Sequence, residues 1–229
     1  MDVTAYLPYE RLYANLNEKQ LCRLLRDARR FQWQALDLQC CGLVALPDTN
    51  LWNLPDLKVL ILGNYYVSFK RLFLGEPNTF SFLPDAMRKL TNLQVLSLTN
   101  TQLAEIPDFI ENFGKLCSFS LRETPVANFP EVLCKLVELR SLYLGSTQIS
   151  MIPESISKLV NLQSLNLSST KITSLPDTLG GLCSLQSLSL KETQIVALPN
   201  AICDLENLEW LDLSVKLELF LIPLVSSPS

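Results

Sequence analysis

The sequence predicts an α/β solenoid, in which short parallel strands line the inside of a curved stack and short helices line its outside. Three residue patterns recur in step every 23 residues, which chance does not produce. The first pattern is an apolar pair around one variable residue, at Leu96-Ser97-Leu98, Phe119-Ser120-Leu121, Leu142-Tyr143-Leu144, Leu165-Asn166-Leu167, Leu188-Ser189-Leu190 and Leu211-Asp212-Leu213. The second is an apolar-proline step, at Ile106-Pro107, Phe129-Pro130, Ile152-Pro153, Leu175-Pro176 and Leu198-Pro199. The third is a threonine, at Thr101, Thr124, Thr147, Thr170 and Thr193.

The repeated unit reads L-x-x-L-x-L-x-x-T-x-I-x-x-L-P-x-x-I-x-x-L. Its L-x-L segment predicts a strand with both leucines in the core, since alternate strand residues face opposite sides. The L-P step turns the chain, and the following I-x-x-L has the apolar spacing of a short helix or 3₁₀ turn. We expect the threonine to turn inward and to hydrogen-bond the backbone of the next unit.

A single unit is too small to fold alone. Residues 162–184 carry about seven core aliphatic side chains, and their burial does not offset the conformational entropy lost when 23 residues become ordered. Neighbouring units must therefore share apolar faces and backbone hydrogen bonds, which predicts one continuous array.

The pattern divides the chain into three parts. Residues 1–32 are predicted to form an N-terminal helical cap, residues 33–213 an array of about eight repeats, and residues 214–229 a degenerate C-terminal tail. The cap contains a helix from about Glu18 to Arg30, with leucines on one face and arginines on the rest. Such a helix covers the open core of a first repeat, and membrane or partner binding are the alternatives.

An insertion interrupts the second unit. The unit uses Leu60 and Leu62 and resumes at Asn78, with extra residues at 65–77. The insertion interleaves aromatic residues with Lys70 and Arg71. We expect it to fold back over apolar neighbours, with contact to a partner or to a nucleic-acid strand as alternatives.

The repeat phase is lost at the far end. After Leu213 the threonine position falls on Lys216 and the next apolar position on Glu218. The apolar residues 219–225 follow. The tail is either an improvised cap or a sign that the chain is a shortened relative of a longer protein.

Composition excludes several classes of function. The chain has no histidine, which removes Ser-His and Cys-His catalysis and most zinc sites. Its net charge of −4 and pI of about 5.0 argue against sequence-independent binding of nucleic acid. Its seven cysteines are scattered without metal spacing, as in a reduced cytoplasmic protein. We expect no cofactor, no signal peptide and no membrane span, because residues 219–225 are too few to cross a bilayer.

The pattern resembles the leucine-rich repeat over all of residues 33–213, with Cys41 and Asn78 at the position that later units give to threonine. The 23-residue L-P form is similar to the repeats of Ras-pathway scaffold proteins and plant disease-resistance receptors. The opening helix and the lengthened second unit resemble cyanobacterial repeat proteins, some of which carry a Roc-COR GTPase module. This resemblance implies a solenoid fold strongly and a function weakly.

The inner face of the sheet is the predicted partner-binding surface, because concave repeat faces are broad and rigid. Alternation places small residues over much of it, including Val95, Ser97, Thr99, Ser120 and Ser189, which we expect to be exposed. Arg, Tyr and Trp are typical of binding hot spots, and charged neighbours such as Glu123 and Glu192 select a partner. The predicted partner-binding residues are Arg122, Tyr143, Asn166, Lys191, Trp210 and Asp212.

An acidic residue follows each apolar-proline step, at Asp48, Asp85, Asp108, Glu131, Glu154 and Asp177. These acids predict outer helices that begin with proline and carry an acid in the first turn, although a basic partner is the alternative. The spacing also predicts i,i+4 ion pairs, at Asp85–Lys89, Glu131–Lys135 and Glu154–Lys158.

These observations predict a non-enzymatic module that holds another protein on its concave face. The alternative is a regulatory component of a GTPase or immune-type signalling system, with a small GTPase or signalling protein as partner. An enzyme is disfavoured, because nothing in the chain supplies a positioned base or metal.

Overall fold

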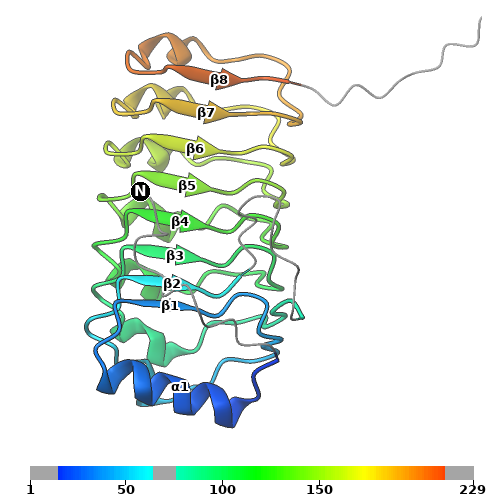
Figure 1. The fold of residues 1–229 in the computed structure, drawn as a ribbon. Helices are drawn as coiled ribbons and strands as arrows, with labels where there is room; N and C mark the ends of the chain where they lie inside the picture. The colour runs from blue at the N-terminus through cyan, green and yellow to red at the C-terminus, as the bar shows by residue number, and fades with distance from the viewer. Residues whose placement is uncertain (1–14, 64–75, 215–229) are drawn as a thin grey trace, which may run out of the picture.

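The structure, a computed structural model, describes residues 15–63 and 76–214. Eight strands form one parallel sheet in which each strand pairs with the next along the chain, so the predicted solenoid is confirmed (Figure 1). The strands are β1 (Ala35–Asp37), β2 (Val59–Ile61), β3 (Val95–Ser97), β4 (Ser118–Ser120), β5 (Ser141–Tyr143), β6 (Ser164–Asn166), β7 (Ser187–Ser189) and β8 (Trp210–Asp212).

Each strand begins one residue earlier than predicted, at Val95 rather than Leu96 in the third repeat. The inter-repeat hydrogen bonds nevertheless continue past the strand. The Leu98 N–H donates to the carbonyl oxygen of Ser120 at 2.9 Å, and the Asn100 N–H to that of Arg122 at 2.7 Å. The strands are short because the chain turns soon afterwards, at Thr99 and Asn100 in the third repeat, and the core leucine Leu98 lies between strand and turn.

That turn places a residue other than glycine in the left-handed region. Asn100, Glu123, Ser146, Ser169 and Glu192 have φ between 54° and 59°, and Cys40 occupies the same place in the first repeat with φ of 52°. This conformation costs about 1–2 kcal/mol for most residues. The N–H groups of Glu123 and Ser146 donate to Gly145 and Ser168 of the following repeats, at 2.9 and 2.7 Å, and these bonds hold the turn.

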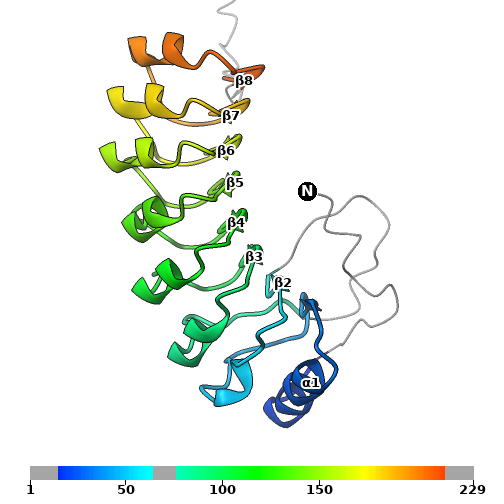
Figure 2. The ribbon, with the colours of Figure 1, turned by 90° about the vertical axis from the view of Figure 1, so that its left-hand side faces the viewer.

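The outer side of the array consists of 3₁₀ helices, as Figure 2 shows opposite the strands. They are η2 (Asn50–Trp52), η3 (Asp85–Lys89), η4 (Asp108–Asn112), η5 (Glu131–Lys135), η6 (Glu154–Lys158), η7 (Asp177–Gly181) and η8 (Asn200–Asp204). The predicted acid in the first turn is confirmed from η3 to η7. Proline precedes these helices as the N-cap, as at Pro153 with ψ of 155°, so its predicted place inside the helix was wrong by one residue.

The predicted i,i+4 ion pairs on the outer side do not form in the described part of the chain. Lys135 pairs with Glu111 of the preceding repeat at 2.6 Å, Lys89 donates to the Asn50 side chain at 2.6 Å, and Asp85 pairs with Arg88. A 3₁₀ helix has three residues per turn, so side chains four apart no longer share a face. The lysines therefore reach the neighbouring repeat.

The predicted N-terminal helix is α1 (Glu18–Arg30), which lies beside the β1 end of the array (Figure 1). Asn17 and Gln20 form a capping box, in which each side chain accepts a hydrogen bond from the other's backbone N–H at 2.9 Å. The helix packs Leu21, Leu24, Leu25 and Ala28 into the core, which follows from the predicted apolar face.

One continuous apolar core runs from α1 to the eighth repeat, filled by the leucines of the repeat pattern. The aromatic residues Trp52, Phe80, Phe113 and Phe119 are fully buried in it. The indole N–H of Trp52 donates to the carbonyl oxygen of Pro47 at 2.8 Å, so this large side chain leaves no polar atom unpaired.

The threonines are buried as predicted at four positions and partly buried at Thr193, but their predicted hydrogen bonds were wrong. Each hydroxyl donates to the carbonyl oxygen three residues earlier in its own repeat, not to the next repeat. Asn78, at the same position, bridges repeats. Its Oδ1 accepts from the N–H groups of Cys41 and Leu43, at 3.1 and 2.9 Å, and its Nδ2 donates to the Leu38 carbonyl oxygen at 2.7 Å.

Most of the predicted insertion and nearly all of the predicted tail lie outside the described residues. Of the insertion, Glu76 and Pro77 are described. The Glu76 N–H donates to Asn15 at 3.3 Å and its carbonyl oxygen accepts from Gly42 at 2.9 Å. The chain therefore returns to the array beside the turn of the first repeat.

Candidate partner-binding surface

The concave face is formed by the outward residues of the eight strands, which the parallel register aligns in rows. One row runs from Val95 through Ser118, Ser141, Ser164 and Ser187 to Trp210. The next row runs from Ser97 through Ser120, Tyr143, Asn166 and Ser189 to Asp212.

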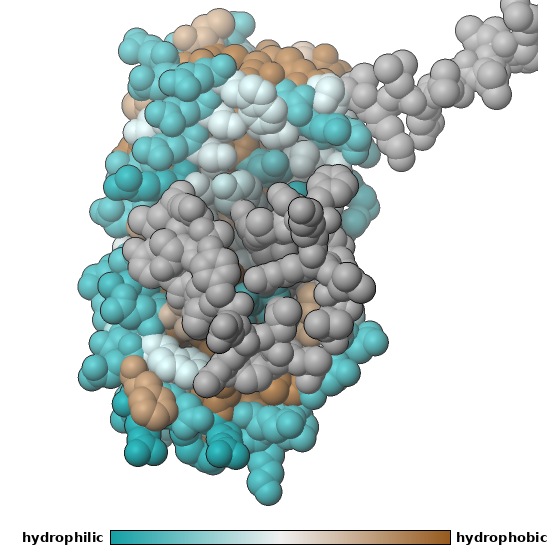
Figure 3. All heavy atoms as spheres, in the orientation of Figure 1, coloured by the Kyte–Doolittle hydropathy of each residue, from teal (hydrophilic) through white to brown (hydrophobic). Residues whose placement is uncertain are grey.

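Exposure on this face is lowest at β2 and β3 and highest at β8. All three residues of β2 and of β3 are buried, and β8 has no buried residue. Between them, β5 and β6 are buried only at their central leucines, whereas β4 and β7 are also buried at their last residue. The accessible part of the concave face therefore extends over β4 to β8. Figure 3 shows mostly polar or pale residues on the part of this face towards β8.

The prediction that the whole face is exposed was wrong at its N-terminal half. Val95 is buried together with Ala35, Val59 and Ile61 in a second apolar cluster. Residues 59–62 read Val-Leu-Ile-Leu, and such an uninterrupted apolar run is typical of a strand buried on both faces. The sequence therefore contained a signal for this burial.

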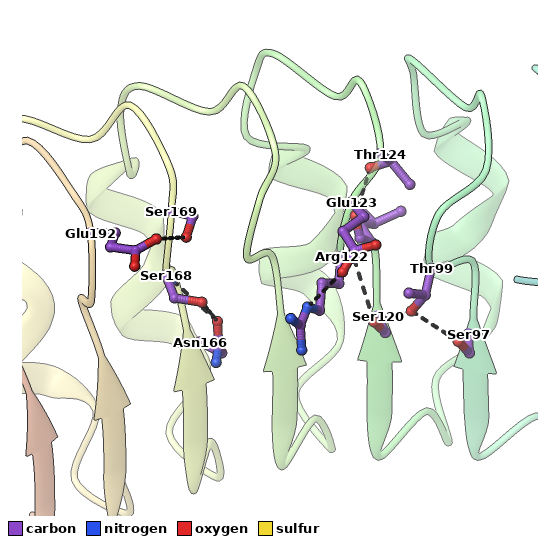
Figure 4. A network of polar contacts seen from close by, with 11 residues as sticks. Ser97, Thr99, Ser120, Arg122, Glu123, Thr124, Asn166, Ser168, Ser169 and Glu192 are labelled. Carbon is purple, nitrogen blue, oxygen red and sulfur yellow. Dashed lines mark hydrogen bonds and ion pairs between the residues drawn. The ribbon is translucent and has the colours of Figure 1, made fainter. Parts of the chain in front are cut away.

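Three predicted surface residues are buried, and they hydrogen-bond to one another. The Thr99 hydroxyl lies 3.2 Å from that of Ser97 and 2.8 Å from that of Ser120 (Figure 4). Ser189 is also buried, although it was expected to be exposed, and it lies in register between the longer side chains of Asn166 and Asp212.

Arg122 and Lys191 project from the turns that follow β4 and β7, and about half of each side chain is exposed. Each cation lies near the acid that follows it in the chain. The Arg122 Nε is 3.3 Å from the Glu123 carboxylate, and the Lys191 Nζ is 3.9 Å from that of Glu192. Exposed pairs of this kind are weak, so both cations remain available to a partner.

Asn166 and Asp212 play the same structural role at the ends of β6 and β8. The Oδ1 of Asn166 accepts hydrogen bonds from the Ser168 N–H at 3.1 Å and from its hydroxyl at 2.7 Å. Asp212 does the same with Ser214, at 3.0 and 2.7 Å. The Ser214 hydroxyl and then its N–H lower the pKa of the Asp212 carboxyl, which keeps it charged. These residues therefore shape the turn as well as the surface.

Gly145 has no side chain, and the structure leaves no room for one at this place on the face. A Cβ atom there would lie 2.7 Å from the Asn166 Oδ1 and 2.8 Å from the Ser168 Oγ. Tyr143 is half-buried on β5, in register between Ser120 and Asn166, and Trp210 is half exposed on β8. The accessible face thus consists of small polar side chains, with Tyr143 among them and Trp210 at the β8 end.

The six predicted residues lie on one face but not in one cluster. Tyr143 and Asn166 are direct neighbours in register, whereas Ser189 separates Asn166 from Asp212. Sequence reasoning missed a contact between repeats, in which the Ser169 hydroxyl donates to the Glu192 carboxylate at 2.9 Å (Figure 4). Only the three-dimensional stacking brings these two turns together.

Within residues 15–63 and 76–214, no three Cys, Asp or Glu side chains gather into a group that could hold a metal ion. Over the same residues, no helix has the length and apolar composition needed to cross a bilayer. The arrangement offers hydrogen-bonding groups, charges and aromatic surface, which are the means of binding.

Two family models match the chain, one described as a leucine-rich repeat region over residues 126–218 and one as a leucine-rich repeat over residues 92–113. A search of curated proteins finds no match. The finer resemblance to Ras-pathway, plant disease-resistance or cyanobacterial repeats stays a prediction.

Solved structures give the same answer. A leucine-rich-repeat protein of Leptospira interrogans is 29% identical over 89% of this chain, with a TM-score of 0.72. The ectodomain of the Arabidopsis thaliana receptor kinase GASSHO1/SCHENGEN3, in complex with CASPARIAN STRIP INTEGRITY FACTOR 2, is 29% identical over 88%, with a TM-score of 0.68. An internalin of Listeria monocytogenes is 26% identical over 74%, with a TM-score of 0.58.

This chain spans 47%, 23% and 45% of those three proteins, respectively. Leucine-rich-repeat proteins are typically non-enzymatic modules that mediate interactions between proteins. The repeat pattern, the parallel sheet and these matches together identify this chain as a leucine-rich-repeat protein.

Proposed function

We propose that the chain is a non-enzymatic module that binds a partner protein on the concave face over β4 to β8. The observation that carries this proposal is the change in exposure along the sheet, from fully buried at β2 and β3 to accessible at β8. The accessible half is the one that carries Arg122, Tyr143 and Trp210, the residue types that dominate binding energies at interfaces.

The surface has the physical features of a protein-binding site. The aligned residues Ser118, Ser141, Ser164 and Ser187 are small, so the backbone of a partner can approach the sheet closely. Their hydroxyl groups offer it hydrogen-bond donors and acceptors. Tyr143 and Trp210 supply apolar area at a low cost in side-chain entropy. Because Asn166 and Asp212 are held by their own turns, less ordering is needed on binding.

The comparisons support this use of the surface. The Arabidopsis ectodomain was solved in complex with a named factor, which shows that a related repeat array serves as a binding module. No described feature favours the GTPase-regulatory alternative. We place the chain in the reducing cytoplasm, since Cys22, Cys117, Cys134, Cys183 and Cys203 are all thiols.

Quantitative affinity capture from native cell extract tests the proposal. The test variant is Arg122→Glu/Tyr143→Ala/Trp210→Ala. The matched control, Lys158→Glu/Met151→Ala/Phe82→Ala, makes similar changes at exposed residues away from the concave face. Circular dichroism and urea unfolding establish that both variants are folded before capture.

We expect a protein that wild type and control enrich and that the test variant loses, followed by at least a tenfold weaker Kd for the purified pair, since hot-spot truncations cost about 2 kcal/mol or more each. Equal enrichment by all three proteins would remove the site from this face. No specific enrichment by wild type would contradict the binding function itself.

A further inference from the structure

The C-terminal end of the described array leaves an apolar face open. At one repeated core position, Leu167 is 0% exposed and Leu190 is 2% exposed, but Leu213 in the eighth repeat is 47% exposed. Ile172 is likewise fully buried, whereas its counterpart Ile195 is partly exposed. In Figure 3 hydrophobic residues are visible at this end of the molecule, among hydrophilic ones.

Backbone groups are open at the same end. Leu144, Leu167 and Leu190 each donate their N–H to a carbonyl oxygen of the following repeat, at 2.8 to 2.9 Å. Leu213 is the next residue in that series, and no following repeat lies among the described residues. β8 is therefore an edge strand beside an apolar face, and such an edge associates with other chains unless it is covered.

The opposite end shows how this array covers its core. There α1 packs its leucines over the first repeat and turns Arg23, Arg26, Arg29 and Arg30 to solvent. A solenoid needs such a cover at both ends, because the terminal repeat would otherwise expose the face that inner repeats share.

Residues 219–225 have the composition that fits the open face. They read Leu-Phe-Leu-Ile-Pro-Leu-Val, carry no charge, and begin five residues after Ser214. Lys216 and Glu218 fall at the threonine and apolar core positions that would complete the eighth repeat, so the regular pattern does not continue past Leu213. A tethered segment reaches the face at an effective concentration in the millimolar range, far above that of a separate molecule.

We propose that residues 219–225 pack against the exposed end of the eighth repeat and close the array within one molecule. The contact covers Leu213 and the partly buried aliphatic residues at this end of the core, which are Ile195, Leu198 and Ile202 of the seventh repeat and Leu208 and Leu211 of the eighth. It borders the concave face at Trp210, so the cover also defines where the accessible sheet surface ends. This inference does not depend on the partner-binding proposal.

Hydrogen exchange on the full-length chain tests the cover. Leu221→Asp/Leu224→Asp places two charges inside the apolar run, and Ser226→Asp/Ser227→Asp places the same two charges just outside it. We expect the first variant to exchange about tenfold faster than wild type at the amides of residues 205–214, because local protection reports local packing. The control should match wild type, and amides of residues 141–167 should be unchanged in both variants.

Light scattering at several concentrations separates this cover from a second copy of the chain. The proposal requires a monomer whose protection at residues 205–214 does not depend on concentration. Protection that rises with concentration together with dimer formation would give the face to a second copy. Equal exchange in the wild type and in both variants would show that residues 219–225 do not cover the face. Either result overturns the proposal.

Discussion

The hydroxyl of Thr147 donates a 2.7 Å hydrogen bond to the carbonyl oxygen of Leu144, three residues earlier in the same repeat. The same bond recurs from the third repeat to the seventh at 2.6 to 2.9 Å. Each recurring threonine therefore holds its turn to the strand of the same repeat. The residue just before it, which has a left-handed backbone, donates its N–H to the next repeat.

Thr147→Val should lower the free energy of unfolding by about 1–2 kcal/mol, because it removes one buried hydrogen bond while keeping the shape of the side chain. Thr147 is 1% exposed, so water cannot replace the hydroxyl. Urea unfolding measures the change. The control is Thr173→Val, at an exposed position, which should stay within about 0.5 kcal/mol of wild type. Equal midpoints for the two variants would contradict this role.

Asn78→Ala should lower the free energy of unfolding by about 3–5 kcal/mol. This cost is clearly larger than the one expected for Thr147→Val. The change leaves the N–H groups of Cys41 and Leu43 and two carbonyl oxygens without their partner in a buried site. Asn161→Ala is the control, since that exposed side chain makes one bond, to the Val137 carbonyl oxygen. Hydrogen exchange should locate the loss at residues 38–43. A cost no larger than that of Asn161→Ala would refute the bridging role.

The contrast between Asn78 and Thr147 marks the limit of what repeat patterns predict. Period and phase located every repeat, since buried leucines must recur with the geometry of the coil. Period and phase could not distinguish a side chain that hydrogen-bonds within its repeat from one that bridges two repeats, because both are buried at the same position. The hydrogen-bonding capacity of the side chain makes the difference. The amide of Asn78 bonds to four backbone groups, whereas a threonine hydroxyl donates only once.

Exposure on the concave face was predictable at Arg122 and Trp210, and partly at Tyr143, but not at Val95 or Thr99. Alternation assigns each strand residue to a face but does not say whether that face is covered. At β2 and β3 the concave face carries its own apolar cluster and hydroxyl network. Such burial depends on neighbours from other repeats, and only the stacked structure brings them together.

The thiols should separate into two reactivity classes. Burial first, and then the charges of Asp37 and Cys40, raise the pKa of the Cys41 thiol to about 12, so at about pH 8 the reactive thiolate fraction is roughly 10⁻⁴. Cys183 and Cys203 are exposed. Iodoacetamide followed by peptide mass spectrometry should modify Cys183 and Cys203 in the native protein and Cys41 only after unfolding.

The raised pKa also makes a prediction about alkaline stability. Because the folded pKa lies above the unfolded one, the neutral Cys41 thiol favours the folded state below about pH 9, and this contribution falls as pH rises toward 12. Cys41→Ser removes the buried thiol and should flatten this alkaline decline in the urea midpoint. An unchanged slope, or rapid native alkylation of Cys41, would contradict the burial of this thiol.

Gly63→Ala should be among the most destabilising single substitutions. A Cβ atom at Gly63 would lie 2.0 Å from the carbonyl oxygen of Thr99 and 2.4 Å from its backbone nitrogen, so the backbones of the second and third repeats would have to separate. The Gly63 N–H donates to the Ser97 carbonyl oxygen at 3.2 Å across the same junction, and that bond would lengthen too. We expect a loss of about 3 kcal/mol in urea unfolding, at the upper end of overpacking costs.

Gly114→Ala is the matched control for this substitution. A Cβ atom at Gly114 would meet nothing within 4 Å, and the residue is exposed in the segment between η4 and β4. Its stability should equal or slightly exceed that of wild type, because alanine narrows the unfolded ensemble. If the two alanine variants unfolded at the same urea concentration, the close contact of the second and third repeats at Gly63 would be wrong. The close packing of the two backbones would then not explain why a glycine stands at position 63.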